Sequence, residues 1–385
     1  MSTKETVDTL LSGGTIITVD GQRRIYRDGA VALRGNIIVA VGKRANLDSR
    51  YEAREARDCR NKLVMPGFVN SHLHFYHTMH RGLAPEGLGG WLWSNFVHGK
   101  VATILTPEDE IIGELIKACV DVVGLGRCTN RLYLESKKMA DDYDTTLNLH
   151  LAGMTEEVTD TRMKTGYRPV ENLYHIGALG RNVCLVHMVH VADREIRMLK
   201  ETQTNVIHCP STALKLNYEL SSKGRFPEML EHGVNVAIGS DASDCSNYAD
   251  MIRTMYLAAV LPKDYRNDAG ISCAEDAIEM ATINGAKAIG MDKEIGPLEP
   301  GKKADVIVIN MRRPEWYPNF SEVQNLVYSA SGDAVETVYI DGRLIMDHRR
   351  VLTVDEDEVM DRCAILGEQV LARSGLQVPG KWPIL

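Results

Sequence analysis

The sequence from Leu63 to Arg81 reads LVMPGFVNSHLHFYHTMHR, an apolar run that leads into two histidines. If this run forms a strand, side chains two positions apart share a face, and His72 and His74 lie ~6–7 Å apart along it. Neutral imidazole is the commonest metal ligand, so the pair is suited to bind one ion from one side. The plain alternative is two hydrogen-bonded histidines at a strand end. The motif alone leaves both interpretations open.

The composition is that of an ordinary globular protein. Of the 385 residues, 44% are hydrophobic and 25% are charged, which is enough apolar material for a sizeable core. The formal net charge of −8 argues against nucleic acid or an anionic membrane as a partner. No apolar run approaches the ~18 residues of a membrane span, and no signal peptide is evident. Eight cysteines without a CxxC pair are typical of a reducing, cytoplasmic location.

Both ends of the chain read as short strands separated by turns. The N-terminal part, residues 1–62, alternates polar and apolar residues around turns at Asp20-Gly21 and Gly35-Asn36. The C-terminal part, residues 297–352, carries ADVIVIN and ETVYIDGRLIM. We predict one small β-sandwich domain built from both termini, with two independent β appendages as the alternative. Residues 353–385 are predicted to form a helix and tail.

The middle of the chain, residues 63–296, alternates apolar strand-like runs with helical patterns. This alternation is typical of βαβ units on a parallel sheet that is buried on both faces. Each strand-like run ends in a residue able to bind a metal or a proton, as catalysis at the C-terminal ends of barrel strands requires. One such residue would be structural, but a series favours a site. The series is His72, His74, His150, His187, His208 and Asp241.

The ordered motifs resemble the amidohydrolase superfamily, and within it the deaminases and chlorohydrolases that act on N-heterocycles. The motifs are HxH from residue 72, HLA from 150, LVHMVHV from 185, VIHCP from 206 and GSD from 239. The resemblance covers nearly the whole chain. It implies an α/β fold with a TIM-barrel-like metal-dependent hydrolase domain over residues 63–296.

The resemblance also implies a role for each site residue. His72, His74, His150 and Asp241 would bind one divalent metal ion, Zn²⁺ by default, with Fe²⁺ or Ni²⁺ compatible with the same ligands. Asp241 would act as general base, and His187 would hydrogen-bond the water or the substrate. His187, His208 and Trp91 would bind the substrate, although Trp91 equally well packs its loop onto the barrel.

These roles predict hydrolysis of a non-peptide C–N bond of a small, nitrogen-rich heterocycle, that is, deamination by metal-activated water. In the branch that deaminates adenosine-type nucleosides a glutamate precedes the tryptophan, whereas this chain has Gly90 before Trp91, which argues against a ribosyl substrate. Two alternatives remain. One is hydrolytic removal of a halide or an alkylamine, and the other is a non-catalytic metal-binding remnant of the family.

Two departures from the family pattern stand out. Related deaminases continue the motif at His150 as HxxE, where the glutamate shuttles protons, but this chain has Gly153. The chain also passes from a helix predicted over residues 107–124 almost directly to the helix before His150. Strand–helix units are therefore missing between Asn130 and Arg131, which predicts fewer than eight barrel strands. Because such a barrel exposes strand edges, we expect a homo-oligomer to cover them.

Overall fold

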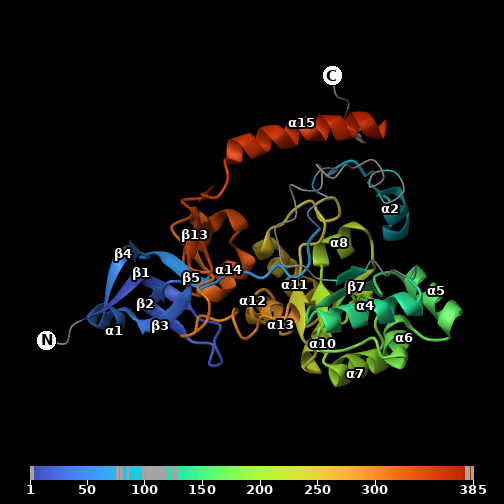
Figure 1. The fold of residues 1–385 in the computed structure, drawn as a ribbon, viewed down its shortest axis with the longest axis horizontal. Helices are drawn as coiled ribbons and strands as arrows, with labels where there is room; N and C mark the ends of the chain where they lie inside the picture. Colours follow the sequence, from blue (N-terminus) through green and yellow to red (C-terminus); the bar gives the residue numbers. More distant parts are fainter. Residues whose placement is uncertain are drawn as a thin grey trace. The chain divides into compact units, whose positions relative to one another are not determined.

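The computed structural model describes residues 4–74, 78, 81–84, 86–97, 100, 120–122, 128–377 and 382 (Figure 1). The chain divides into two compact units. The first comprises Met1–Val69, Ala274–Lys287 and Met291–Glu356. The second comprises Asn70–Cys273, Ala288–Gly290 and Asp357–Leu385.

The first unit contains one mixed sheet built from both ends of the chain. Its order is β14-β13-β12-β11-β5-β1-β2-β3, and β4 pairs in parallel with β1. The antiparallel pairing of β5 with β11 joins the two termini, as predicted, so they are not separate appendages. The strands are β1 (Glu5–Ile17), β2 (Ile25–Arg34), β3 (Ile37–Lys43), β4 (Tyr51–Asp58), β5 (Lys62–Pro66), β11 (Val306–Asn310), β12 (Val335–Ile340), β13 (Arg343–Asp347) and β14 (Arg350–Val351).

A single hydrophobic cluster draws residues from both ends of this sheet. Leu11 of β1 and Val31 of β2 pack in the same cluster as Val308 of β11 and Tyr339 of β12. In strands whose polar and apolar residues alternate, the apolar side chains gather on one face of the sheet. Burial of that face stabilises the sheet. The helices of this unit are α1 (Arg44–Arg50), α12 (Ala274–Met280), α13 (Ile283–Ala288), α14 (Glu322–Tyr328) and the 3₁₀ turns η4 (Pro314–Trp316) and η5 (Gly332–Ala334).

The second unit contains a parallel sheet whose strands alternate with helices, as the middle of the sequence predicts. Its order among the described residues is β10-β9-β8-β7-β6. All five side chains of β8 are buried, which agrees with a strand covered on both faces. The strands are β6 (Val120–Val122), β7 (Leu147–Leu151), β8 (Val183–His187), β9 (Asn205–His208) and β10 (Val236–Ile238).

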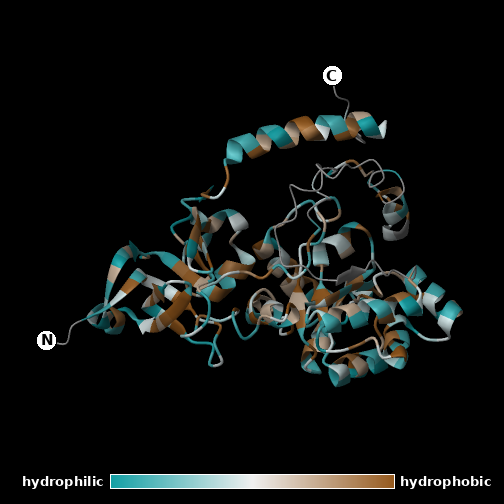
Figure 2. Cartoon of the chain, in the orientation of Figure 1, coloured by the Kyte–Doolittle hydropathy of each residue, from teal (hydrophilic) through white to brown (hydrophobic). Residues whose placement is uncertain are grey.

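The helices of the second unit connect these strands. Helix α6 packs against α4, α5 and α7, and Figure 1 shows all four beside the parallel strands. In Figure 2 the hydropathy colours of α15 alternate along its length, and only Val370 is buried among its described residues. The helices are α2 (Gly90–Phe96), α4 (Asn130–Asp142), α5 (Thr155–Thr165), α6 (Pro169–Ile176), α7 (Asp193–Thr202), α8 (Pro210–Lys215), α9 (Leu220–Lys223), α10 (Phe226–Glu231), α11 (Met251–Arg266) and α15 (Glu356–Ser374).

The expectation that the apolar run leading into the histidine pair forms a strand entered at Pro66-Gly67 is wrong. Strand β5 ends at Pro66 and belongs to the mixed sheet, and no strand is assigned from Gly67 to His74. The reason is Pro66-Gly67, since proline has no amide hydrogen to continue a ladder and glycine frees the backbone to turn. The segment that follows nevertheless runs beside β10, because the Ser71 amide donates to the Ile238 carbonyl at 3.1 Å.

The helix predicted over residues 107–124 is wrong at its end, where Val120–Val122 form β6 and pair in parallel with β7. The remainder, residues 101–119, lies outside the described part of the chain. Residues 123–127 are not described, and the hydroxyl of Thr129 caps α4 by accepting from the Leu132 amide. Because α4 begins at Asn130, the Asn130–Arg131 junction lies in its first turn.

No helix in the described ranges is long and apolar enough to span a membrane.

Candidate active site

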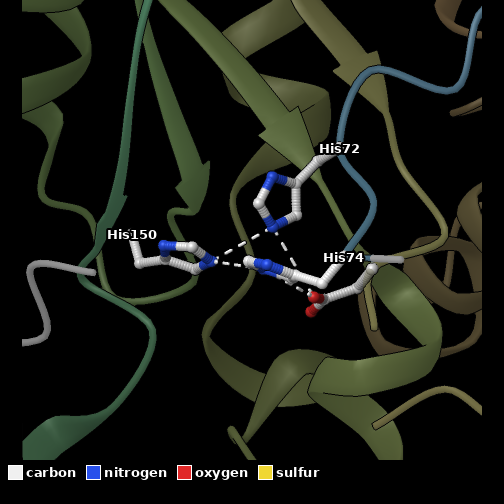
Figure 3. Close-up of side chains that lie close together, drawn as sticks. His72, His74 and His150 are labelled. Carbon is white, nitrogen blue, oxygen red and sulfur yellow. Dashed lines mark hydrogen bonds and ion pairs between the residues drawn. The ribbon is translucent and has the colours of Figure 1, made fainter. Parts of the chain in front are cut away.

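Four predicted metal ligands meet in the second unit. His72 and His74 come from the extended segment beside β10, His150 lies in β7, and Asp241 follows β10. Their ligand atoms all lie within 4.8 Å of one another. The Nε2 atom of His150 is 3.1 Å from that of His72 and 3.2 Å from that of His74 (Figure 3). The carboxylate Oδ1 of Asp241 is 3.6 Å from His72 Nε2 and 3.7 Å from His74 Nε2.

These distances fit a metal ion. Ligand atoms at the corners of a tetrahedral zinc site with bonds of 2.0–2.1 Å stand ~3.3 Å apart, close to the separations found here. Burial lowers the pKa of His150 well below its usual value, with the charges of His72 and His74 acting in the same direction, so its ring is neutral and has a lone pair to give. Three nitrogens and one carboxylate oxygen converging on one point form a donor set suited to a divalent cation.

Asp241 is the ionised member of the cluster. Burial raises the pKa of this carboxyl, but the hydrogen bond from His72 and the charges of the neighbouring histidines outweigh burial and hold it well below its usual range. The carboxylate also accepts from the Ala242 amide at 2.7 Å through Oδ1. A buried carboxylate that stays charged is available both as a ligand and as a base.

The backbone beside β10 fixes the first histidine. The Asp241 amide donates to the His72 carbonyl at 3.0 Å, so the two ligands are tied to each other through the main chain. At Gly239, between β10 and Asp241, an added Cβ would lie 2.8 Å from both the Cβ and the carbonyl oxygen of His72. Only glycine permits this approach, so the sequence Gly239-Ser240-Asp241 positions ligands on two segments at once.

His187 faces the same cluster from the end of β8. Its Nδ1 lies 4.0 Å from Oδ2 of Asp241 and has no hydrogen-bond partner among the described residues. Burial lowers the pKa of His187 to about 4, so the ring is neutral near pH 7. Its backbone φ is +76° and that of Asp241 is +60°, in the left-handed region that non-glycine residues seldom adopt. Such strain is concentrated at functional sites.

The turn after His150 is followed by a buried carboxylate, Glu157, for which the sequence offers two interpretations, a replacement for the missing glutamate or the start of a solvated loop or helix. Glu157 is fully buried, and its Oε2 accepts from the Gly153 amide at 2.9 Å. Burial raises the pKa of Glu157 to about 7, against the lowering effect of hydrogen bonds from the amides of Ala152, Gly153 and Met154. The carboxylate therefore braces the turn at which related deaminases carry their glutamate. The sequence could have indicated this contact, because Glu157 lies in the first turn of α5, where carboxylates accept hydrogen bonds from free backbone amides.

A cavity of about 280 Å³ is linked to the cluster through one side chain, since neither the four ligands nor His187 line it. Tyr218, which lines it, holds its ring edge-on to His187 with 5.3 Å between ring centroids. The lining also includes Asn217 and Glu219, from a loop that follows β9 and α8 and to which sequence reasoning assigned no role. The sequence could have indicated these residues by their place in the chain, because binding residues gather in the loops that follow the C-terminal ends of parallel strands.

The predicted substrate-binding residues lie in different places. His187 is at the cluster, as described above. His208 stacks on Phe226 at 3.7 Å between centroids, burial lowers its pKa to about 3, and it is not among the described residues that line the 280 Å³ cavity. Trp91 lies in α2, but its side chain is outside the described part of the chain. The neighbouring Trp93 is buried.

Comparisons with known proteins agree with this geometry. Residues 113–345 match the Amidohydrolase family. The 5-methylthioadenosine/S-adenosylhomocysteine deaminase of Moorella thermoacetica is 30% identical over 91% of this chain and 96% of its own length. The corresponding deaminase 1 of Syntrophus aciditrophicus is 28% identical over 97% of this chain and all of its own. That alignment spans 448 residues, more than the 385 of this chain, so the Syntrophus enzyme has residues without a counterpart here.

Solved structures share the fold. An adenosine deaminase from Xanthomonas campestris with bound zinc superposes with a TM-score of 0.88, at 22% identity, over 96% of this chain and all of that one. A mutant atrazine chlorohydrolase from Arthrobacter aurescens, complexed with zinc and atraton, gives a TM-score of 0.83 at 18% identity, over 93% of this chain and all of that one. The α/β architecture, with its mixed and parallel sheets, is therefore that of these hydrolases.

Proposed function

Because the chain belongs to the amidohydrolase family, we propose that it is a metal-dependent hydrolase that removes an amino group from a small nitrogen heterocycle. The observation that carries this proposal is the convergence of His72, His74, His150 and Asp241 within 4.8 Å. The curated relatives, which are named as deaminases and align along nearly the whole chain, support it.

We assign a role to each side chain at the reacting centre. A divalent ion, zinc by preference and iron or nickel as alternatives, would lower the pKa of a water molecule and polarise the ring carbon. Asp241, ionised and within reach of that position, takes the proton of the attacking water. His187, neutral and without a hydrogen-bond partner on Nδ1 among the described residues, is left to bond the water or the ring.

Delivery of a proton to the leaving amine is the weak step of this mechanism. Gly153 stands where related deaminases carry glutamate, and Glu157 binds the amides of the same turn instead of facing the cluster. Asp241 would then have to return the proton that it took. Since general acid–base assistance contributes typically about 10²–10⁴-fold, we expect slower turnover than in relatives that have the glutamate.

Two substrate classes follow from different observations. The names of the relatives favour 5-methylthioadenosine or S-adenosylhomocysteine, which carry the amino group on a purine. Gly90 favours a free heterocycle, because a side chain there would overlap the ring of Tyr218 and the sulfur of Met154, so the position cannot hold a glutamate for ribose. We propose an aminopurine or amino-triazine ring as the shared feature, with Trp91, His187 and His208 as its contacts.

A second reaction is favoured by Gly153 itself. A halide leaves a ring as a stable anion and needs no proton, whereas an amine has to be protonated as it leaves. A site that lacks the proton shuttle is therefore better suited to displace chloride from a chlorinated ring than to displace ammonia. We keep hydrolytic removal of a halide as the second candidate. Removal of an alkylamine, the other alternative, needs the same proton as removal of ammonia and gains nothing from Gly153.

We also infer that the parallel sheet is a shortened TIM-barrel-like domain and that the mixed sheet closes as a small β-sandwich. In the described residues β6 pairs only with β7, and we infer that a second chain pairs with its other edge. An exposed strand edge can pair with other chains and cause aggregation, and a homo-oligomer that covers this edge would prevent it. Size-exclusion chromatography with light scattering tests this inference, and a stable monomer would count against it.

A panel of substrates tests the proposed reaction. The zinc-loaded full chain should release ammonia from at least one of 5-methylthioadenosine, S-adenosylhomocysteine, adenine and an amino-triazine, or chloride from a chloro-triazine. His74→Ala with an unchanged circular dichroism spectrum should abolish the turnover. No turnover on any member by protein that holds its metal would favour the non-catalytic remnant and overturn the proposal.

A further inference from the structure

A second, larger cavity in the same unit has a different character from the metal cluster. It measures about 810 Å³ and lies among α5, the end of α11 and the loops before α7 and α10. None of the four metal ligands lines it, and the same is true of His187. Thr155 and His190 line both this cavity and the smaller one beside Tyr218. Five cationic side chains line it: Arg162, Arg168, Lys223, Arg225 and Arg266.

Three of these cations are held in place by carboxylates that are not part of the lining. Arg168 donates through Nε to Glu195 at 2.7 Å, and Glu195 is fully buried. Arg266 donates through Nη2 to Glu228 at 2.8 Å. Arg225 pairs with Asp193. Each guanidinium is thus held by a carboxylate and still has further N–H groups to offer, since arginine carries five donors in a rigid fork.

The other two cations are not held in this way. Arg162 and Lys223 are exposed, and neither forms an ion pair or a side-chain hydrogen bond with any described residue. The three carboxylates offset the three paired arginines. Glu219, which accepts from the lining residue Thr155 at 2.8 Å, offsets part of the two remaining positive charges, so the cavity wall keeps a net positive charge. Side chains that converge on a concave surface with a surplus of one charge concentrate ions of the opposite sign.

The remaining lining is apolar. Val158 and Val191 form the inner part, and Val191 is 6% exposed. Met163 and Tyr265 stand at the rim, 75% and 53% exposed, and the guanidinium of Arg266 lies 5.3 Å from the centre of the Tyr265 ring. A wall of this kind offers an apolar or flat group a surface beside the cations.

We propose that this cavity binds a small organic anion, a phosphate or carboxylate joined to an apolar or aromatic body. Its volume lies within the range of sites for small ligands, which are typically about 300–1,000 Å³. Arg162 and Lys223 supply the charge, the oriented arginines supply directed N–H donors, and Val158, Val191 and Tyr265 contact the body. The proposal stands independently of the proposed reaction, because the cavity contains none of the residues that carry it.

Isothermal titration of the metal-loaded full chain tests the proposal, with phenyl phosphate and benzoate as the anionic probes. Inorganic phosphate and phenol separate the contributions of the charge and the apolar body. Phenyl phosphate or benzoate should bind more tightly than either, and more weakly as salt rises, because the charges of Arg162 and Lys223 are exposed to screening. Equal binding of phenyl phosphate and inorganic phosphate would show that the apolar wall plays no part and would overturn the proposal.

Variants locate the binding. Arg162→Gln combined with Lys223→Gln should raise the Kd of the anionic probe by about tenfold or more, since each change removes a charged donor without breaking an internal ion pair. The matched control is Arg131→Gln, which removes an exposed charge from α4 and should leave the Kd unchanged. Unaltered binding by the double variant, or no binding by the wild-type chain, would overturn the proposal.

Discussion

A Cβ atom added to Gly153 would lie 3.4 Å from the Cβ of His187 and 3.5 Å from its Cδ2, at ordinary van der Waals distance. The backbone at Gly153 lies outside the left-handed region, so a larger residue meets no conformational barrier there. A Cβ there would also lie 3.4 Å from Cε2 of the Tyr218 ring, so a side chain at position 153 begins between this ring and the imidazole facing Asp241. The residue that related deaminases use to move protons is absent from this position, where a Cβ atom fits.

Restoring that residue should raise deamination. Gly153→Glu is expected to increase kcat on the best amino-substituted ring by about 10²-fold or more, because it supplies a proton carrier next to His187. Gly153→Gln has the same shape without the carboxylate and serves as the control. An equal effect of both changes, or no effect of either, would show that proton delivery does not limit the reaction.

His187 is expected to act on the substrate and not to bind the metal. His187→Ala should lower kcat by about 10²–10⁴-fold and leave the metal content unchanged, because the four ligands stay in place. Elemental analysis beside steady-state kinetics checks both parts. The potential ligand atoms of His187, Cys209 and Asp241 also lie within 4.8 Å of one another, close enough to hold a metal ion. Loss of the metal together with activity would therefore make His187 a ligand and refute its assigned role.

Gly239 is expected to control the position of His72. Gly239→Ala places a methyl group 2.8 Å from the His72 backbone oxygen and Cβ, so the segment that carries the ligand has to move. The Kd for zinc, measured by competition with a chelator, should rise about 10–100-fold, as happens when groups that orient metal ligands are lost. Gly367→Ala in α15 meets nothing within 4 Å and is the control. Equal affinity of both variants would count against this contact.

Glu157 is expected to give the fold a distinct pH dependence. Burial raises the pKa of Glu157 from an ordinary 4.5 to about 7, so the folded chain holds this proton more tightly than the unfolded chain does. The free energy of unfolding should therefore fall as pH rises from about 4.5 to about 7, by up to about 3 kcal/mol from this group.

Urea unfolding at pH 5 and pH 8 checks the sign of this effect. The Glu157→Gln variant cannot ionise at this position. The difference in free energy of unfolding, variant minus wild type, should therefore be larger at pH 8 than at pH 5. Titration of the buried histidines is common to both chains and cancels in the difference. The exposed neighbour provides the control as Glu156→Gln, which should follow the wild type at both pH values. A stability difference that does not change with pH would mean that Glu157 has no raised pKa.

The four metal ligands could be predicted from the sequence because each belongs to a short local motif. His72 and His74 are two residues apart, and His150 and Asp241 each end a buried strand-like run. The mixed sheet was also predictable, since both termini alternate polar and apolar residues. In each case local pattern and tertiary structure agree.

What the sequence concealed depends on contacts between distant segments. Pro66-Gly67 looks like the entry to a strand, but β11 pairs with β5 only as far as Pro66, so the strand ends there. The segment Val120–Val122 is too short for its hydrophobic periodicity to distinguish a strand from a helix. It is a strand because it pairs with β7. The closeness of Gly239 to His72 joins residues far apart in sequence. Neither position alone predicts it.

Metal content, measured by elemental analysis on the purified and size-fractionated full chain, decides whether the four ligands form a working site. The wild-type chain should hold about one divalent ion, and His150→Ala, with the same circular dichroism spectrum, should hold far less. His150 is the informative position because its Nε2 is within 3.2 Å of both other ligand nitrogens. A compact wild-type chain that binds no metal, or a variant that binds as much as the wild type, would contradict the metal site and the hydrolase built upon it.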